Sequence, residues 1–133
     1  MLLLLVDDDA DDRDIFRESL TFIDDSMKCV SAKNGLECLS ILGTMPSAPD
    51  YIFLDLNMPL MDGFTCLKEI RKTKAFDDVQ IIMYSTTIGP NEQRRCASLG
   101  ANGFLVKPPN FGELGMTLKT LFGSHITVDS EKP

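Results

Sequence analysis

Four hydrophobic segments of this chain end directly on a polar or charged side chain. The segments are residues 2–6, 51–54, 79–84 and 104–106, and they are followed by Asp7, Asp55, Ser85 and Lys107. Apart from Gln80, these segments are hydrophobic throughout, which is typical of parallel strands that are covered on both faces. In an open parallel α/β sheet, ligands and reacting groups sit at the carboxyl ends of the strands. We therefore expect these four side chains to meet at one edge of a sheet.

Segments with helical periodicity alternate with the strand-like ones. After the strands, hydrophobic residues recur at spacings of three or four, as in the series Leu114, Leu118 and Leu121. A fifth strand-like segment, residues 27–32, is less apolar and predicts a strand at the edge of the sheet. Strict alternation of five strands and five helices predicts right-handed βαβ units and a parallel sheet. The predicted fold class is therefore α/β.

Residues that begin and end helices agree with this division. Asn34 and Asn110 can each cap a helix, and Pro90 can begin a helix that Gly100 ends. The helix expected after residue 63 has a basic outer side, made of Lys68, Arg71, Lys72 and Lys74. Such a run is typical of a solvated face, and docking of an acidic partner is the alternative.

The length of 133 residues fits one domain that can bury a proper core. We predict that this domain covers residues 1–123. Residues 124–133 are polar, lack periodicity and end in proline, so we expect them to form a disordered tail.

Composition excludes several classes of function. The formal net charge is −7 and no cluster of Lys and Arg stands out, so nucleic-acid binding by this domain is not expected. No hydrophobic run approaches the roughly 20 residues that a membrane-spanning helix needs. The opening run, residues 1–6, is too short for a signal peptide and has no basic segment before it. We therefore expect a cytoplasmic protein without membrane insertion.

The four cysteines predict core packing rather than chemistry. They are Cys29, Cys38, Cys66 and Cys96, and no two of them form a C-x-x-C pair. Each lies inside a hydrophobic periodic segment. We interpret them as small core residues of a protein in a reducing compartment.

Six acidic residues lie within eight positions after the first strand. They are Asp7, Asp8, Asp9, Asp11, Asp12 and Asp14, interrupted by Arg13. Acids favour the start of a helix, which is a sufficient explanation for Asp11 and Asp12. Asp7 and Asp8 end a buried strand beside the expected position of Asp55, where close carboxylates repel one another unless a cation lies among them. Because Mg²⁺ prefers oxygen ligands, we predict a Mg²⁺ site.

Asp55 can do more than bind a metal ion. A carboxylate held beside Mg²⁺ can attack phosphorus and form an aspartyl phosphate. The charge on the phosphoryl oxygens must then be neutralised by a cation and a metal together. Lys107 is the expected cation, and Ser85 is the expected hydroxyl donor. Pro108 fixes the loop after Lys107, and a cis Lys107–Pro108 bond is one way of doing so.

Four motifs occur in a fixed order: residues 6–8 (V-D-D), 55–63 (D-L-N-M-P-L-M-D-G), 81–86 (I-I-M-Y-S-T) and 104–108 (F-L-V-K-P). Together they resemble the receiver domains of two-component response regulators, in particular the stand-alone chemotaxis type. The resemblance extends to about residue 123. It implies a flavodoxin-like (βα)5 three-layer sandwich, whose five-stranded sheet has the order 2-1-3-4-5.

The resemblance also implies a role for each site residue. Asp55 would accept a phosphoryl group from the phosphohistidine of a sensor histidine kinase or a histidine phosphotransfer protein. Mg²⁺ would be bound by the side chains of Asp8 and Asp55, by the backbone carbonyl of Asn57 and, through water, by Asp7. Lys107 would contact a phosphoryl oxygen.

A conformational switch is implied as well. Ser85 would move toward the phosphoryl group, and the ring of Phe104, which lacks the hydroxyl of the tyrosine common there, would turn inward. Thr86 stands where the family usually has alanine, so we expect Thr86 and Asn57 to modulate access to Asp55. The surface of residues 90–122 would bind a downstream target protein, and dimerisation on phosphorylation is left open.

Two other functions remain as alternatives. A Mg²⁺-dependent phosphohydrolase acting through an aspartyl phosphate would need a second acid two residues after the nucleophile, where this chain has Asn57. A flavodoxin-like cofactor carrier would need a phosphate-binding loop after the first strand, where the acids would repel a flavin phosphate. We therefore predict a signalling domain that catalyses only its own phosphorylation and dephosphorylation.

Overall fold

The computed structural model describes residues 1–23 and 26–130, with side chains described for all of these except residues 111 and 124–130. The strands are β1 (Leu2–Val6), β2 (Lys28–Ala32), β3 (Tyr51–Leu54), β4 (Gln80–Ser85) and β5 (Gly103–Val106). The helices are α1 (Ala10–Thr21), α2 (Gly35–Thr44), α3 (Gly63–Arg71), the short 3-10 helix η1 (Lys74–Phe76), α4 (Pro90–Ser98) and α5 (Phe111–Ser130). Neighbouring strands are parallel, in the order β2-β1-β3-β4-β5, which confirms the predicted flavodoxin-like sheet.

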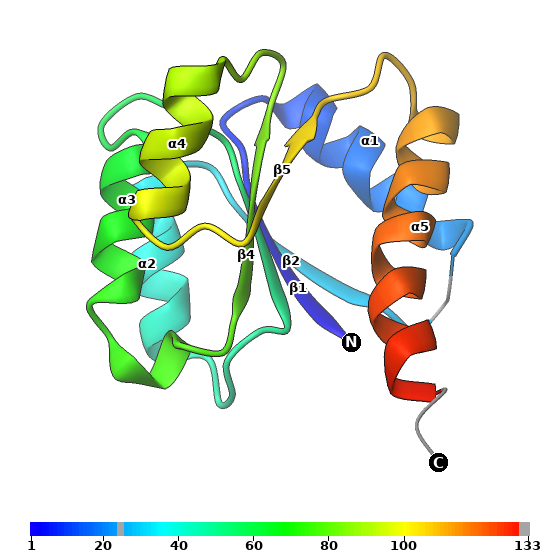
Figure 1. Ribbon diagram of the computed structural model, residues 1–133, viewed down its shortest axis with the longest axis horizontal. Coiled ribbons are helices and arrows are strands. Elements are labelled where there is room, and N and C mark those ends of the chain that lie inside the picture. Colours follow the sequence, from blue (N-terminus) through cyan, green and yellow to red (C-terminus); the bar gives the residue numbers. More distant parts are fainter. Residues whose placement is uncertain (24–25, 131–133) are drawn as a thin grey trace.

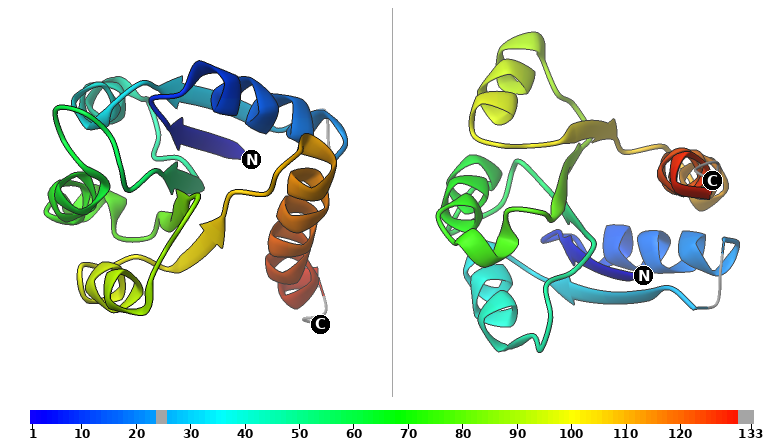
Figure 2. Two further views of the ribbon diagram at one scale, coloured as in Figure 1. Left: turned by 90° about the horizontal axis from the view of Figure 1, so that it is seen from above. Right: turned by 60° about the horizontal axis from the view of Figure 1, so that its bottom comes forward.

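Helices cover both faces of the sheet and give the molecule three layers. α1 and α5 lie on one face, and α2, α3 and α4 lie on the other (Figure 1, Figure 2). Beneath α1 and α5 the core is rich in aromatic rings, contributed by Phe16, Tyr51, Phe53, Tyr84 and Phe122. The ring centroids of Phe16 and Phe53 lie 5.0 Å apart, at a distance typical of favourable aromatic pairs. The opposite face of the sheet is packed mainly with aliphatic side chains.

The strand register brings the polar strand ends to one edge of the sheet. Val6 pairs with Leu54, and Leu54 pairs with Met83. The ladder continues past the strands, because the backbone N–H of Asp55 donates to the carbonyl oxygen of Val6 at 3.0 Å. The backbone of each polar residue that follows a strand is therefore fixed by hydrogen bonds to the neighbouring strand.

The helix ends follow the predicted signals. Asn34 Oδ1 accepts a hydrogen bond from the Glu37 N–H at 2.8 Å, and Asn110 Oδ1 accepts one from the Glu113 N–H at 2.9 Å. Gly100 follows α4 with a φ of +106°, a left-handed conformation that favours glycine. These caps confirm where α2, α4 and α5 begin or end.

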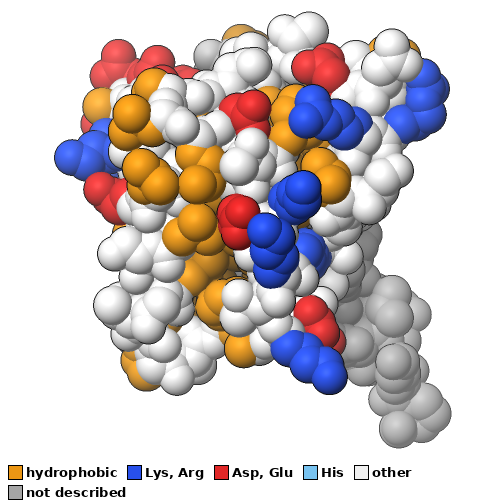
Figure 3. Space-filling view, turned by 90° about the vertical axis from the view of Figure 1, so that its left-hand side faces the viewer, with side chains coloured by type: hydrophobic (Ala, Val, Ile, Leu, Met, Phe, Trp, Pro, Cys, Tyr) orange, Lys and Arg blue, Asp and Glu red, His pale blue; other side chains and the backbone are white. Residues whose placement is uncertain are grey.

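The basic side of α3 needs a correction. The helix ends at Arg71, so Lys74 belongs to η1 instead of the predicted outer face. Exposed Lys and Arg side chains do occur on the surface formed by α2, α3 and α4 (Figure 3). Arg71, however, is half-buried and donates five hydrogen bonds to groups outside its own helix. It was interpreted as a solvated residue, whereas it joins several segments together.

The predicted disordered tail also needs a correction. α5 continues past residue 123 to Ser130, so the predicted domain boundary falls inside this helix. Extending a formed helix adds one hydrogen bond for each residue, and no proline interrupts the chain before Pro133. Residues 131–133 of the predicted tail lie outside the described residues. Among the described helices, none combines the length and hydrophobicity that crossing a membrane requires.

Three of the four cysteines belong to the core beneath α2, α3 and α4, as predicted. Cys38, Cys66 and Cys96 are fully buried there. Cys29 on β2 is half-buried, and burial raises the pKa of its thiol to about 11. A thiol with a raised pKa is a poor nucleophile at neutral pH, so Cys29 also has the properties of a packing residue.

Candidate functional site

Three carboxylates converge at the carboxyl edge of the sheet. Oxygen atoms of Asp7, Asp8 and Asp55 all lie within 4.8 Å of one another. Asp7 is fully buried and Asp55 is 5% exposed, whereas Asp8 is exposed to solvent. Backbone N–H groups hold the two buried acids: the Asp9 N–H donates to Asp7 Oδ1 at 3.0 Å, and the Asn57 N–H donates to Asp55 Oδ1 at 3.2 Å.

Lys107 places its ammonium group against these acids. Its Nζ lies 2.8 Å from Asp7 Oδ2, 3.0 Å from Asp12 Oδ2 and 3.1 Å from Asp55 Oδ2. The side chain is only 9% exposed, and Nζ lies 5.3 Å from the centre of the Tyr84 ring. Burial lowers the pKa of Lys107, but contact with Asp7 and the charges of Asp55 and Asp7 outweigh it, so the pKa is raised. Lys107 is therefore a permanent cation at neutral pH.

Asp7 Oδ2 is a buried polar atom without a hydrogen-bond donor. Its 2.8 Å contact with Lys107 Nζ is an ion pair that lies outside the angles of a hydrogen bond. Burial raises the pKa of Asp7, while Lys107 lowers it, and the net direction is upward. One ammonium facing several carboxylates leaves the site with excess negative charge.

This donor set fits a hard divalent cation. Asp7, Asp8 and Asp55 offer carboxylate oxygens at close range, and one buried oxygen has an unused lone pair. A cluster of carboxylate oxygens suits Mg²⁺. It does not suit copper or a zinc–thiolate site, because these use softer sulfur ligands. The acid cluster predicted from the strand ends is therefore present, together with the predicted lysine.

The other predicted residues lie around this cluster. Ser85 is buried at the end of β4, next to β3, and its carbonyl oxygen accepts a hydrogen bond from the Lys107 N–H at 2.8 Å. Asn57 and Thr86 are exposed at the rim. No cis peptide bond occurs in the described residues, so the Lys107–Pro108 bond is trans and the cis alternative is wrong.

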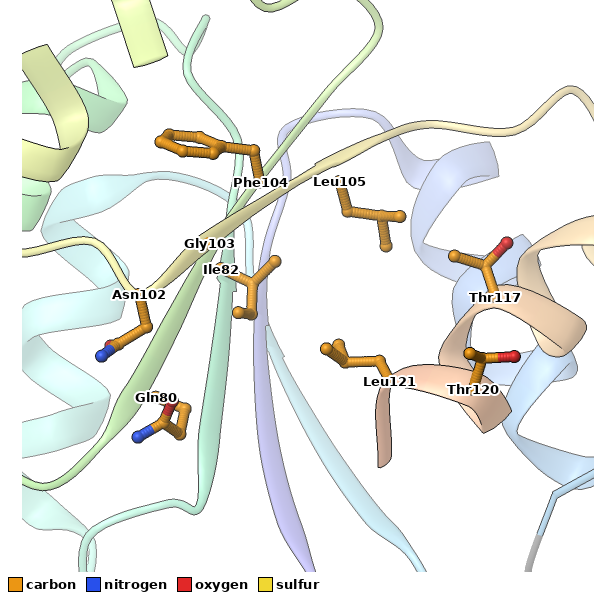
Figure 4. Close-up of a pocket in the computed structure, with 9 residues that line it drawn as sticks. All are labelled: Gln80, Ile82, Asn102, Gly103, Phe104, Leu105, Thr117, Thr120 and Leu121. Atoms are coloured by element: carbon orange, nitrogen blue, oxygen red, sulfur yellow. The ribbon is translucent and has the colours of Figure 1, made fainter. Parts of the chain in front are cut away.

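Phe104 lies apart from the acids, on β5. It is 37% exposed, and its ring points away from α5 while Leu105 points toward it (Figure 4). A groove of about 620 Å³ opens here between β4, β5 and α5. Its lining comprises Gln80, Ile82, Asn102, Gly103, Phe104, Leu105, Thr117, Thr120 and Leu121. Most of these residues belong to the predicted output surface, residues 90–122.

Sequence reasoning missed one member of the site, Asp12. It was interpreted only as an acid suited to a helix start, yet its Oδ2 accepts a hydrogen bond from Lys107 Nζ. Asp9 caps α1 and places Asp12 in the first turn. Side chains in a helix lean toward its N-terminus, and the N-terminus of α1 faces the end of β1. The position of Asp12 soon after the cap could therefore have predicted that its side chain reaches the site.

A parallel sheet in this order, with an acidic pocket and a lysine at its carboxyl edge, defines a receiver for phosphorylation-dependent signalling. The sequence matches the model of the response regulator receiver domain family over residues 3–119. The chain belongs to this family.

Individual relatives agree with the family. The chain is 34% identical to a chemotaxis protein CheY homolog of Campylobacter jejuni, over 81% of this chain and 82% of that protein. The structure of Vibrio cholerae CheY4 is similar with a TM-score of 0.78 and 30% identity, covering 90% of this chain and 96% of that one. The phosphorylated cyanobacterial phytochrome response regulator RcpA gives a TM-score of 0.81 at 26% identity, covering 90% and 89% of the two chains.

Larger proteins also contain a similar segment. The chain spans 13% of the length of the sensor histidine kinase CheAY of Helicobacter pylori. It spans 37% of the length of a protein-glutamate methylesterase/protein-glutamine glutaminase of Methanococcoides burtonii. The similarity to these proteins therefore concerns one part of each of them.

Proposed function

We propose that Asp55 accepts a phosphoryl group from the phosphohistidine of a sensor histidine kinase or a histidine phosphotransfer protein. One observation carries the proposal: Asp55 Oδ2 lies 3.1 Å from the buried ammonium of Lys107, beside two further carboxylates. In the transfer, an oxygen of Asp55 forms a bond to phosphorus. The phosphorus–nitrogen bond breaks, and its electron pair stays on the imidazole.

The surrounding residues would hold Mg²⁺ and orient the phosphoryl group. The ligands would be the side chains of Asp8 and Asp55, the backbone carbonyl of Asn57 and, through water, Asp7. When bound, Mg²⁺ neutralises charge on the phosphoryl oxygens. Lys107 would donate a hydrogen bond to one of these oxygens, which supplies the second positive charge that the transfer needs.

Phosphorylation would then change a protein-binding surface. Ser85 would turn toward the phosphoryl group, and Phe104 would move inward from its exposed position. The groove beside β5 lies next to Phe104, so a change in this ring alters the surface of residues 90–122 that would bind a downstream protein. A shift of this kind requires the phosphoryl group to stabilise one conformer more than the other.

The first test uses a small phosphodonor. Wild-type protein incubated with Mg²⁺ and acetyl phosphate is expected to gain the mass of one phosphoryl group, measured on the intact protein. Asp55→Asn is expected to gain none, because the amide nitrogen is a poor nucleophile. Chelation of Mg²⁺ with EDTA should prevent the gain in wild type. An unchanged wild-type mass, with no binding of beryllofluoride, would remove the proposal. Multiple turnover of free phosphate esters would instead favour a phosphohydrolase.

A second test concerns access to Asp55. Thr86 is exposed directly after Ser85, so its side chain is expected to narrow the approach of phosphodonor and water. Thr86→Ala should raise the rates of phosphorylation and dephosphorylation roughly threefold, equivalent to about 0.6 kcal/mol of barrier. Thr87, the next residue, is also exposed, so Thr87→Ala is the matched control and should change neither rate. Equal rates in wild type and Thr86→Ala would contradict this role.

A further inference from the structure

Asp12 contacts Lys107 from a helix, whereas Asp7 and Asp55 contact it from strand ends. Asp12 belongs to the first turn of α1, and its side chain is 32% exposed. Lys107 Nζ donates hydrogen bonds to two carboxylates, Asp12 Oδ2 at 3.0 Å and Asp55 Oδ2 at 3.1 Å. Asp7 contributes an ion pair at 2.8 Å without the angles of a hydrogen bond. Asp12 is therefore one of the three carboxylates that hold this ammonium, and the only one of them that belongs to a helix.

Capping of the helix does not account for this contact. The cap of α1 is Asp9, whose Oδ1 accepts hydrogen bonds from the N–H groups of Asp11 at 2.9 Å and Asp12 at 3.2 Å. Asp11 occupies the same helical turn, is exposed, and makes no ion pair with Lys107. The two neighbouring acids therefore share the effect of the helix dipole, whereas Asp12 alone of the two contacts the lysine.

We infer that Asp12 is a positioning residue, which keeps the ammonium of Lys107 at the phosphoryl site during the reaction of Asp55. The inference rests on the proposed function. Once one oxygen of Asp55 is bonded to phosphorus, the hydrogen bond from Lys107 to Asp55 is free to pass to a phosphoryl oxygen. Asp12 and Asp7 then remain against Nζ, and of these two Asp12 accepts a hydrogen bond from it at 3.0 Å. An ammonium has three donors, so it can keep Asp12 and bind a phosphoryl oxygen at the same time.

The test compares Asp12→Asn with Asp11→Asn, which removes the same charge from the same turn. With Mg²⁺ and acetyl phosphate, Asp12→Asn should lower the phosphorylation rate roughly tenfold, a loss within the range that misplacement of a reacting group produces. The phosphorylation rate of Asp11→Asn should stay within about twofold of wild type, because this change removes an exposed charge whose electrostatic effect on the site is screened by solvent and salt. Asp12→Glu, which restores a carboxylate, should recover part of the loss. In a Lys107→Met background, Asp12→Asn should cause no further loss beyond that of Asp11→Asn.

A second measurement needs neither metal nor phosphodonor. The ammonium signal of Lys107 in ¹⁵N NMR spectra should be sharp in the wild type and in Asp11→Asn, since the group is buried and held. It should broaden or disappear in Asp12→Asn. Equal rates and equal signals in the two variants would overturn the inference while leaving the phosphorylation of Asp55 intact. Absence of phosphorylation in wild type would instead remove the proposed function, and the NMR comparison would still decide whether Asp12 holds Lys107.

Discussion

Gly63→Ala is expected to lower the free energy of unfolding by about 3 kcal/mol, at the upper end of the cost of overpacking. Gly63 is the first residue of α3 and lies against the end of β3. A Cβ atom at this position would collide with the carbonyl oxygen of Asp55 and would lie 2.7 Å from the Cα atom of Leu56. Both are backbone atoms, so no side-chain rotation can relieve the collision. The helix cannot simply move away, because the Gly63 N–H donates to the Leu56 carbonyl oxygen at 2.9 Å.

The collision should also reach the site, because it displaces the backbone that positions Asp55. We expect Gly63→Ala to be phosphorylated by acetyl phosphate at least roughly tenfold more slowly than wild type, since small displacements of a reacting group have large effects on rate. Urea denaturation and intact mass measure the two effects. Gly43→Ala is the control: nothing lies within 4 Å of its Cβ position, and alanine in this helix should add about 0.5 kcal/mol of stability. A urea midpoint of Gly63→Ala equal to that of wild type would show that this backbone can relax.

Arg71→Met is expected to destabilise the protein by about 3 kcal/mol, because hydrogen bonds from charged groups contribute roughly 1.5–3 kcal/mol each and do not add fully. The guanidinium donates to three backbone carbonyls before β4, those of Phe76 at 2.7 Å, Asp77 at 3.4 Å and Val79 at 2.9 Å. It also donates to the carbonyl oxygen of Gly100 at 3.0 Å and to Oδ1 of Asn102 at 2.7 Å. Burial lowers the pKa of Arg71, against the opposing effect of the Asp77 charge.

Loss of this guanidinium removes a donor from carbonyl groups of two connections, of which the Phe76 carbonyl oxygen keeps the Val79 N–H at 3.2 Å. Methionine keeps most of the hydrophobic stem of arginine, so the measured loss reports mainly the hydrogen bonds. Arg71→Lys should recover little, because one ammonium cannot reproduce the planar five-donor geometry. Lys68→Met, an exposed change on the same helix, should alter stability by less than about 0.5 kcal/mol. A denaturation midpoint of Arg71→Met matching that of Lys68→Met would contradict the tethering role.

Much of the fold could be predicted because the relevant signals are local. Buried parallel strands such as Tyr51–Leu54 must be hydrophobic throughout, and the side chain that ends such a strand must lie at the carboxyl edge. Capping residues such as Asn34 act on the N–H groups two or three residues away. These signals, together with the parallel arrangement of the strands, predicted that Asp7, Asp8 and Asp55 would lie close together, as they do.

Reliance on local signals also explains why the end of α5 was predicted wrongly. Its last turns lack the hydrophobic periodicity that marks a packed helix, so the sequence predicted a tail after residue 123. The structure continues the helix to Ser130. Once a helix has formed, each further residue adds a hydrogen bond at little cost, and this continuation needs no pattern in the sequence.

The sequence by itself determined the α/β alternation, the polar strand ends and the identity of the phosphoacceptor candidate, because each depends on residues close together in the chain. Only the tertiary structure decided that Lys107 divides its hydrogen bonds between Asp12 and Asp55, and that Arg71 faces inward. These contacts join residues 95, 52 and 31 positions apart. A long, flexible cationic side chain can extend into solvent or contact any of several acceptors. Its position in the sequence therefore does not reveal which acceptor it contacts. The packing of helices on the sheet makes that selection, since it decides which acceptors lie within hydrogen-bond distance of the charge.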